Sequence, residues 1–599
     1  MKARFVTVPT LGLSLLAAAA VLHGGTARAD DGPTTRPTDP LWEPVAVSDG
    51  TIPPAGELDP TAWDLPGELI VDLKDDVEES AITSFLRGLG LTFHPTALES
   101  ETKAEIVDVP RGLMAETIAK LRSDPRVEIV EPLARVRAFF VPNDPLLKDQ
   151  WHMERIGATR AWDFATGRGV TVAVVDTGIA CEDHGPFMKG TDLARTDCVS
   201  GWNVVTGNEH ANDDQGHGTH VAGTIAQSTD NAIGGAGVAF HARLMPVKVL
   251  NADGFGTTAD VADGIRWAAE HGANVINLSL GGPRNSKILQ KAIDYARSRD
   301  VVVVAAAGNT GGSVQFPGAN DGVIGVSAVG PDDKIAKFSS RGEGVDIGAP
   351  GVNVTQQTIC NKGRNKCETF PAWNGTSMAS PHVAGAAALV MSMGVTDPSA
   401  VEAALRGTAR VVDDSEAGKK LYGAGVLQAA SAVERLTFMH ALVRIAALLG
   451  LTFLVARGAR KKNANAATPW TPLYWIPALI AGPGLFFFAP WILPRVHLGV
   501  DILARPLADL DLLLGVNLHR FLPLANALIP FGLTALTFGV KKARPAVAGL
   551  AVGTAAYLAS VVALGEATGP FGKTALIAWA AVNAMICVWI ARTNLAETN

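Results

Sequence analysis

The sequence predicts an α/β domain built on a parallel β-sheet, preceded by a small α+β unit and followed by an all-α region rich in apolar tracts. Three observations support this. Apolar, β-branched runs alternate with helical patterns between residues 170 and 310, a shorter alternation precedes them, and tracts almost free of charge fill the last quarter of the chain. We place the boundaries at residues 1–29, 30–66, 67–140, 141–435 and 436–599.

The α/β domain starts from the run Val172–Val175, which is apolar and ends at Asp176, so we expect a buried strand there. A helix is expected from His217. Beyond it, strands and helices alternate, which predicts a parallel sheet with helices on both faces. The expected elements are strand Arg243–Leu250, helix Thr257–His271, strand Asn274–Leu280, helix Ser286–Arg299 and strand Val301–Ala307.

Ser377 stands at the start of a predicted helix, directly after a glycine turn in the segment Gly375–Gly385. The start of a helix has unpaired N–H groups and the positive end of the helix dipole, so it favours negative charge that develops beside it. A nucleophilic hydroxyl at this position also needs a base. His217 lies between glycines at another helix start, and Asp176 ends a strand. The order acid, histidine, serine is one of the known orders of a Ser-His-Asp triad.

Four segments together resemble the subtilase family of serine endopeptidases: Asp176–Gly178, His217–Gly223, Ala305–Asn309 and Gly375–Ala379. The resemblance implies a three-layer subtilisin-like fold in which Ser377 attacks the scissile carbonyl. His217 then acts as general base, Asp176 orients it, and the Asn309 amide stabilises the oxyanion. His220 and His382, about one helical turn beyond catalytic residues, are expected to be structural.

The resemblance also implies a substrate cleft whose extended edges pair with the substrate backbone. The residues expected there are Ser279, Leu280, Gly281, Ala306, Ala307 and Gly308. Neither segment carries a charge, so we expect a hydrophobic or medium-sized side chain before the cut. No cofactor is required for this chemistry. Subtilases often bind structural calcium, for which Asp213 and Asp214 are candidate ligands, although solvated loop acids are an equally good interpretation.

The cysteines fit export to an oxidising compartment. Four of the five lie in the α/β domain, and their short spacings suggest disulfides Cys181–Cys198 and Cys360–Cys367, although spacing does not prove pairing. Cys587 lies in an apolar tract and is interpreted as a buried thiol.

The first 29 residues have a basic start, an apolar run through Leu22 and the sequence Ala27-Arg28-Ala29, as in a secretory signal peptide. An uncleaved anchor is the alternative. Residues 67–140 resemble the inhibitory propeptide of many subtilases, a ferredoxin-like β-α-β-β-α-β unit. We expect self-cleavage between Arg135 and Asn143; a permanently attached domain is the other interpretation. The expected elements are strand Glu68–Leu73, helix Glu78–Gly88, strand Ala104–Val109, helix Ala115–Leu121 and strand Val127–Val130.

The last region contains five tracts near the length of a membrane-spanning helix, about 20 residues. They are Phe438–Ala456, Leu473–Leu493, Phe521–Val540, Ala546–Leu564 and Thr574–Ala591. Basic residues follow the first, third and fifth tracts, which fits five spans with the protease exported. Arg444 is expected to reach outward to water, and Glu566 and Lys573 to be solvated. A buried hydrophobic core is the rival interpretation.

These features predict a self-processing serine endopeptidase tethered to a bacterial cell membrane, with its protease domain extracytoplasmic or periplasmic. Its expected partners are polypeptide substrates, its own propeptide as inhibitor, and the lipid membrane. The net charge of −7 gives no reason to expect nucleic acid. The alternative is a membrane-anchored, protease-like binding or signalling protein.

Overall fold

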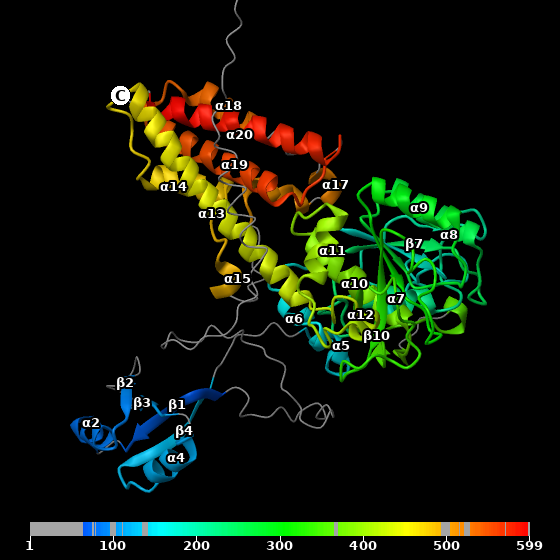
Figure 1. Cartoon of the computed structure of the whole chain (residues 1–599), viewed down its shortest axis with the longest axis horizontal. Coiled ribbons are helices and arrows are strands. Elements are labelled where there is room, and N and C mark those ends of the chain that lie inside the picture. The colour runs from blue at the N-terminus through cyan, green and yellow to red at the C-terminus, as the bar shows by residue number, and fades with distance from the viewer. Residues whose placement is uncertain are drawn as a thin grey trace, which may run out of the picture. The chain divides into compact units, whose positions relative to one another are not determined.

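The computed structural model describes residues 64–74, 77, 79–95, 104–110, 112–134, 142–364, 369–492, 504–513, 515–519, 527–569 and 571–596 (Figure 1). The predicted signal peptide, nearly all of the predicted linker and most of the predicted cleavage segment lie outside these residues. The chain divides into two compact units, one of which is Pro40–Phe139. Each unit is described separately.

The smaller unit is an antiparallel α+β domain, as predicted. Its sheet has the order β2-β3-β1-β4, with Ile70 of β1 opposite Ile106 of β3. Leu69, Val71 and Leu86 are fully buried in its core. The elements in chain order are β1 (Asp64–Leu73), α2 (Glu79–Gly88), β2 (Thr92–Pro95), β3 (Ala104–Asp108), α4 (Met114–Arg122) and β4 (Val127–Ala134).

The larger unit contains a seven-stranded parallel sheet of order β11-β10-β9-β8-β5-β7-β6. Nearly every strand residue is buried, because helices cover both faces and leave no polar face to alternate with the apolar one. The strands are β5 (Thr171–Asp176), β6 (Trp202–Asn203), β7 (Arg243–Lys248), β8 (Val275–Leu278), β9 (Val302–Ala306), β10 (Val323–Val329) and β11 (Ile347–Pro350).

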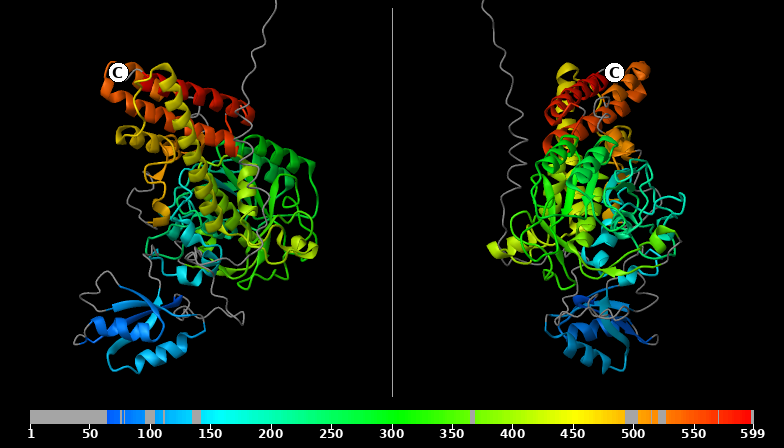
Figure 2. Two further views of the ribbon diagram at one scale, coloured as in Figure 1. Left: turned by 60° about the vertical axis from the view of Figure 1, so that its left-hand side comes forward. Right: turned by 90° about the vertical axis from the view of Figure 1, so that its right-hand side faces the viewer.

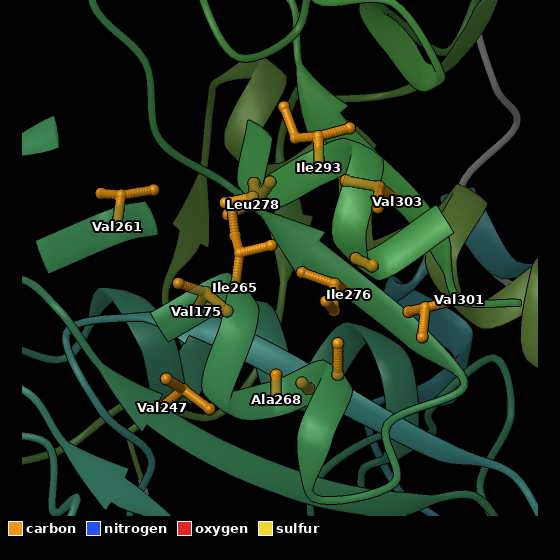
Figure 3. Packing of buried hydrophobic residues seen from close by; sticks show 14 of the residues in the cluster. Val175, Val247, Val261, Ile265, Ala268, Ile276, Leu278, Ile293, Val301 and Val303 are labelled. Atoms are coloured by element: carbon orange, nitrogen blue, oxygen red, sulfur yellow. The ribbon is translucent and has the colours of Figure 1, made fainter. Parts of the chain in front are cut away.

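Two groups of helices form the outer layers. Helices α8 (Thr258–Glu270) and α9 (Lys287–Ser298) pack on one face of the sheet, where Ile265 and Ile293 meet Val175, Ile276 and Val303 (Figure 3). Each such aliphatic side chain contributes about 1.5–3 kcal/mol by its burial. Helices α7 (His217–Ala226) and α10 (Thr376–Met391) pack against each other, and α10 also packs on the sheet, so the predicted three-layer α/β fold is confirmed.

Shorter elements connect these layers. They are η3 (Leu147–Asp149), α5 (Trp151–Arg155), α6 (Ala158–Ala161), η4 (Thr191–Leu193), β12 (Val354–Thr355), η5 (Asn361–Gly363), β13 (Ala372–Trp373), α11 (Pro398–Arg406) and α12 (Glu416–Tyr422).

The C-terminal region is helical and begins with α13, which continues out of the α/β domain as one long helix (Figures 1 and 2). Among the described residues, three helical segments are long and apolar enough to cross a membrane: Ala429–Lys462, Lys541–Leu564 and Lys573–Ala596. The elements are α13 (Ala429–Lys462), α14 (Pro472–Ala481), α15 (Ala489–Ile492), η6 (Leu507–Leu513), α17 (Val516–His519), α18 (Leu528–Thr537), η8 (Lys541–Ala543), α19 (Arg544–Leu564) and α20 (Lys573–Ala596).

Two of the five predicted tracts form shorter helices than expected. The tract that begins at Leu473 is split between α14 and α15, because Pro483 closely follows the end of α14 and proline cannot continue a helix. Glycines let α14 pack closely on α19: a Cβ on Gly549 would lie 2.0 Å from the carbonyl oxygen of Tyr474. Small residues at such contacts are typical of packed membrane helices.

Candidate active site

Polar side chains from several segments meet at the carboxyl edge of the parallel sheet. Asp176 is the last residue of β5, and Asn309 follows the end of β9 by three residues. His217 is the first residue of α7, and Ser377 is the second residue of α10. Parallel strands place their carboxyl ends at one edge, where ligand sites of α/β sheets lie. The four predicted catalytic residues therefore belong to one site.

Asp176 and His217 form a hydrogen-bonded pair. Asp176 is fully buried, and its Oδ1 lies 2.8 Å from Nδ1 of His217. The same oxygen accepts the backbone N–H of Thr177 at 2.8 Å. A carboxylate can only accept, so Nδ1 of His217 carries the proton and Nε2 is left with its lone pair. This tautomer is the one that can remove a proton from a hydroxyl.

The charge of Asp176 sets the proton affinity of His217. Burial lowers the pKa of His217, but the negative charge of Asp176 and its hydrogen bond outweigh burial, and Asp213 adds to their effect. The pKa of His217 therefore lies above its usual value. A more basic imidazole is a better acceptor for the proton of an attacking hydroxyl.

Ser377 forms its hydrogen bond with the end of β8. Its Oγ donates to the carbonyl oxygen of Ser279 at 3.0 Å, and Oγ of Ser279 donates to the carbonyl oxygen of Ser377 at 2.8 Å. A hydroxyl has one proton, so in this conformation it is not donated to His217. Catalytic hydrogen bonds often form only in the complex with substrate.

Asn309 is held by the residue before the serine. Its Oδ1 accepts the backbone N–H of Thr376 at 2.8 Å and the hydroxyl of Thr376 at 2.9 Å. With the carbonyl oxygen occupied, the amide N–H₂ is left as a donor, and its nitrogen lies 3.6 Å from where a Cβ on Gly375 would stand. Asn309 as a residue is solvent-exposed. A donor beside a serine at a helix start is the arrangement of an oxyanion hole.

The chain matches known proteases over the segment that builds this site. Residues 167–425 match the Subtilase family, Peptidase S8. Subtilisin Savinase of Lederbergia lenta is 42% identical over 284 residues, which cover 47% of this chain and 97% of that protein. The chain belongs to the subtilase family. Thermitase of Thermoactinomyces vulgaris is 39% identical over 274 residues, 45% of this chain and 92% of thermitase.

The smaller unit has its own match. Residues 64–132 match the Fervidolysin N-terminal prodomain. The crystal structure of fervidolysin from Fervidobacterium pennivorans is 25% identical with a TM-score of 0.43, covering 62% of this chain and 61% of that chain. The two family matches show that this subtilase is a serine endopeptidase that acts on polypeptides and carries an inhibitory prodomain.

The two predicted substrate segments of the subtilase domain differ in their free backbone groups. Leu280 and Gly281 follow the end of β8 and are partly or fully exposed. By contrast, Ala307 pairs with Val326 and Gln315, and the oxygen of Gly308 accepts the N–H of Ser340. The expectation that both segments pair with substrate stays a prediction. In the second segment, backbone groups of Ala307 and Gly308 already form hydrogen bonds within the domain.

Gln315 is a site residue that the sequence analysis missed. A Cβ on Gly308, where φ is +106°, would lie 2.6 Å from Oε1 of Gln315, and a Cβ on Gly281 would lie 3.4 Å from its Cβ. The Gln315 side chain therefore occupies the space between the two predicted substrate segments. No local sequence signal marks it, because the contact depends on how distant loops meet.

The other two histidines are buried next to the site. His220 Nε2 donates to the carbonyl oxygen of Pro371 at 3.1 Å, and His382 Nδ1 donates to that of Met378 at 2.8 Å. Burial lowers the pKa of each to about 4, so both are neutral at physiological pH. Trp373, which the sequence analysis also missed, stacks on His220 with ring centroids 4.4 Å apart. These contacts fit the expected packing role.

The two acids proposed for calcium have other partners. Asp213 is buried and accepts hydrogen bonds at both oxygens, including the hydroxyl groups of Thr177 and Thr219. Asp214 forms an ion pair with Lys248 at 2.7 Å. Among the described residues, no group of three or more His, Cys, Asp or Glu side chains is placed to hold a metal ion. The calcium prediction remains untested and gains no support at this position.

Asp192 is a second candidate for a cation ligand. It is fully buried, and its carboxylate accepts only N–H groups, from Gln227, Asn231 and the backbone of Gly235. Burial raises the pKa of Asp192 to about 7, and the nearby charge of Asp144 adds to the shift. A cation at Asp192 would need the amide side chains of Gln227 and Asn231 to turn, which breaks the bonds that their oxygens now accept from the N–H groups of Gln357 and Ile233.

One predicted disulfide is present: Cys181 and Cys198 are bonded. Cys360 is also disulfide-bonded, while Cys367, its predicted partner, lies outside the described residues. Cys587 is a buried free thiol, as expected.

Proposed function

We propose that this subtilase is a membrane-tethered extracytoplasmic endopeptidase made as a self-processing zymogen, and that Ser377, His217, Asp176 and Asn309 perform its chemistry. The observation that carries the proposal is the Asp176–His217 hydrogen bond of 2.8 Å at the sheet edge that also holds Ser377 and Asn309. It provides a base in the correct tautomer beside a hydroxyl and an oxyanion donor.

The reaction follows from these positions. Ser377 Oγ bonds to the scissile carbonyl carbon while its proton moves to Nε2 of His217, and the resulting imidazolium is stabilised by Asp176. The oxyanion accepts from the Asn309 amide and from the backbone N–H of Ser377, which has no acceptor within its helix because it lies in the first turn. His217 then protonates the leaving amine. Water repeats the sequence to release the acyl group.

The apolar helices support a membrane tether. Only 33% of the most apolar stretch of α13 and of α20 is buried, so most of their side chains face outward. Phe453 on α13 is 67% exposed and Trp589 on α20 is 61% exposed. Large apolar side chains of this kind on a bundle surface need a lipid environment or a partner.

The positions of basic residues at the helix ends support the proposed orientation of the chain in the membrane. Arg460, Lys461 and Lys462 end α13, and Gly458 of α13 lies against the guanidinium of Arg592 near the end of α20. Lys541 and Lys542 precede α19. The positive-inside rule assigns these ends to the cytoplasm and the protease domain to the other side. The signal peptide predicted at residues 1–29 agrees with export.

Contacts support five crossings rather than three. Arg505 donates to the carbonyl oxygen of Ser392 and Asn517 to that of Gly272, both in the protease domain. The segment that carries them lies between the basic residues Lys462 and Lys541, which we place on the cytoplasmic side. The chain must therefore cross the apolar layer twice between them, near α14 and α18, although each helix has only 10 residues.

Labelling with a fluorophosphonate probe tests the proposal. In membranes washed with alkaline carbonate, we expect labelling of the wild-type chain and none of the Ser377→Ala variant. Labelling that persists without Ser377, or no labelling of either protein, overturns the catalytic assignment. Release of the chain by carbonate overturns the tether instead.

Self-processing has a separate test. Mass spectrometry of the wild-type protein should find a new N-terminus between Arg135 and Asn143, whereas the Ser377→Ala variant should keep residues 64–134. Equal trimming of both proteins means that another protease removes the prodomain.

A further inference from the structure

The C-terminal region contacts the amino edge of the parallel sheet. The backbone N–H of Val516 donates to the carbonyl oxygen of Gly169, which precedes β5 by two residues. Asn274, directly before β8, donates through its side chain to Oδ1 of Asn517 at 2.9 Å. These contacts join the starts of β5 and β8 to one segment of residues 436–599, which we call the membrane region.

A second group of contacts lies at the end of α10. The N–H groups of Thr396 and Asp397 both donate to the carbonyl oxygen of Glu566 at 2.9 Å, and Lys573 forms an ion pair with Asp397 at 2.9 Å. Arg505 contacts Ser392 directly after the helix. Ser377 stands at the other end of this helix, so α10 runs from the catalytic edge to the contact with the membrane region.

The lengths of β5 and α10 give similar distances between the active site and the contacts with the membrane region. Strand β5 has six residues, which extend about 20 Å at 3.3–3.4 Å per residue. Helix α10 has 16 residues, or about 24 Å at 1.5 Å per residue. The membrane region therefore contacts the domain at the edge opposite the active site, about 20 Å away.

Charged pairs fix the contacting segments to the membrane helices. Asp509 forms an ion pair with Arg444 of α13 at 3.2 Å and accepts the hydroxyl proton of Tyr557 of α19 at 2.7 Å. His440 of α13 forms an ion pair with Glu566 at 2.5 Å. Arg444 is thus buried and paired, so the expectation that it reaches outward to water is wrong, whereas Lys573 is paired with Asp397 but remains exposed, as expected. The cavity between these groups holds about 20 Å³, the space of a single water.

Helix α13 adds a rigid connection. The N–H of Ala429, its first residue, donates to the carbonyl oxygen of Ile156, and Glu434 forms an ion pair with Arg160 of α6. The helix then continues without a break to Lys462 (Figure 1). The glycines of this helix, Gly450 and Gly458, lie well beyond its junction with the protease domain, so the junction itself is a regular helix.

From these contacts we infer that the membrane region docks on the face of the protease domain opposite the cleft, so that the active site faces away from the lipid and cleaves only bonds well above the membrane surface. This inference rests on the proposed membrane tether. It names a substrate class: exported polypeptides and long ectodomains, not bonds next to a membrane span.

The number of residues that a membrane-anchored substrate needs between its span and the cleavage site can be estimated. An extended chain advances at most about 3.3–3.6 Å per residue, so a height of about 20 Å needs about six residues between lipid and cleft. Several more must lie in the cleft beside the scissile bond. A substrate anchored in the same membrane therefore needs about 10 residues between its span and the cut.

Anchored reporters with spacers of 5, 10, 20 and 40 residues before one cleavage sequence test this in membranes that contain the full-length enzyme. We expect the 5-residue reporter to be cut at least tenfold more slowly than the 40-residue reporter. Equal rates for both overturn the inference. A soluble peptide with the same sequence must be cut, because its resistance would instead refute the proposed protease activity.

An undocked variant provides the matched comparison. Arg505→Ala, Asn517→Ala and Lys573→Ala remove side-chain contacts, and a 12-residue Gly/Ser insertion after Leu436 releases the domain. This variant should cut the 5-residue reporter at least fivefold faster than wild type, while the soluble-peptide rate stays within twofold and verifies folding. If this variant cuts the soluble peptide but still fails to cut the 5-residue reporter, docking of the protease domain does not determine which spacer length is needed.

Discussion

Replacing Asn309 by aspartate separates two functions of that side chain. In the structure its Oδ1 accepts two hydrogen bonds from Thr376, at 2.8 and 2.9 Å. An aspartate has the same shape and keeps an oxygen at that position, so the loop before Ser377 stays anchored. The amide donor is lost, and a negative charge takes its place. Asn309→Asp therefore tests the oxyanion role without removing the anchor.

The expected loss of kcat in Asn309→Asp is large, because the amide donor acts mainly in the transition state. Loss of one oxyanion donor reduces kcat by about 10²–10³-fold, a magnitude known from the equivalent donor in subtilisin. Repulsion between the carboxylate and the oxyanion adds to this loss at pH values where the aspartate is ionised. Because the ground-state carbonyl makes little use of the donor, KM should change little.

Steady-state hydrolysis of a chromogenic peptide measures both constants. Thr376→Val is the control, because it keeps the backbone N–H bond to Asn309 and the amide donor while it removes the hydroxyl, which donates to Asn309 and accepts the N–H of Gly308. It should reduce kcat by less than tenfold. Thermal unfolding of all three proteins should agree within a few degrees.

Two results would refute the assignment. If Asn309→Asp keeps kcat within tenfold of wild type, the amide is not an oxyanion donor. If the loss appears in KM, or if Thr376→Val causes an equal loss in kcat, Asn309 acts by holding the loop.

The remaining predictions concern charge, stability and specificity. Asp176→Asn should reduce kcat by about 10⁴-fold and move the acid limb of the kcat/KM profile to lower pH, because it removes the charge that raises the pKa of the catalytic histidine; an unmoved limb contradicts this. For Asp192, whose pKa is raised to about 7, the folded state keeps a proton that the unfolded state loses. Without calcium, the free energy of unfolding should therefore fall between about pH 4 and pH 7, by at most about 1.4 kcal/mol per pH unit, and calcium should restore it. Thermal melts with a chelator test this, and an equal calcium response in Asp192→Asn would place the ion elsewhere. Replacing both Cys181 and Cys198 by serine should cost about 3 kcal/mol in denaturant unfolding, since their bond closes a loop of 17 residues; an unchanged midpoint would oppose it. Gln315→Gly should enlarge the pocket and favour larger aromatic residues before the cut in a peptide library, and an unchanged profile would place Gln315 outside it.

The proposed catalytic residues can be picked out from the sequence because each lies at the end of a strand or the start of a helix. Asp176 ends an apolar strand, while His217 and Ser377 begin helices after glycine turns. Once the strands are parallel, their carboxyl ends must meet, so the shared site follows from the pattern alone. The conformation of Ser377 does not follow, because its partner Ser279 lies 98 positions away.

Features that depend on contacts between distant segments are less readable. Asp213 and Asp214 attracted a calcium prediction because they are adjacent in sequence, yet their partners are hydroxyl groups and Lys248. The other candidate carboxylate, Asp192, is surrounded by groups from separate loops, including Asn231. Two acids that are adjacent in sequence need not share a ligand, because a cation site is formed by whichever oxygen atoms the fold brings together.

Hydropathy predicts the apolar tracts of the membrane region, but it does not predict where their helices end or which charged residues form ion pairs. Tract length cannot show where proline ends a helix, as after α14. Nor can it show whether a charge within a tract reaches water or meets an opposite charge. Arg444 meets Asp509, which lies in a separate segment between the apolar tracts.

The charged groups of the membrane region say what that region does beyond anchoring. An anchor needs only apolar residues, and ionisable side chains at membrane depth cost free energy that pairing recovers only in part. Yet His440 and Arg444 on α13 pair with Glu566 and Asp509, and these partners belong to segments that contact the protease domain. The charges thus lie where helices, loops and protease meet rather than along the surface that faces lipid. Such a placement has a physical purpose if the region must hold the protease in one orientation, since apolar contacts alone would let the helices slide. We therefore propose that these helices, besides tethering the subtilase, hold its active site in one orientation.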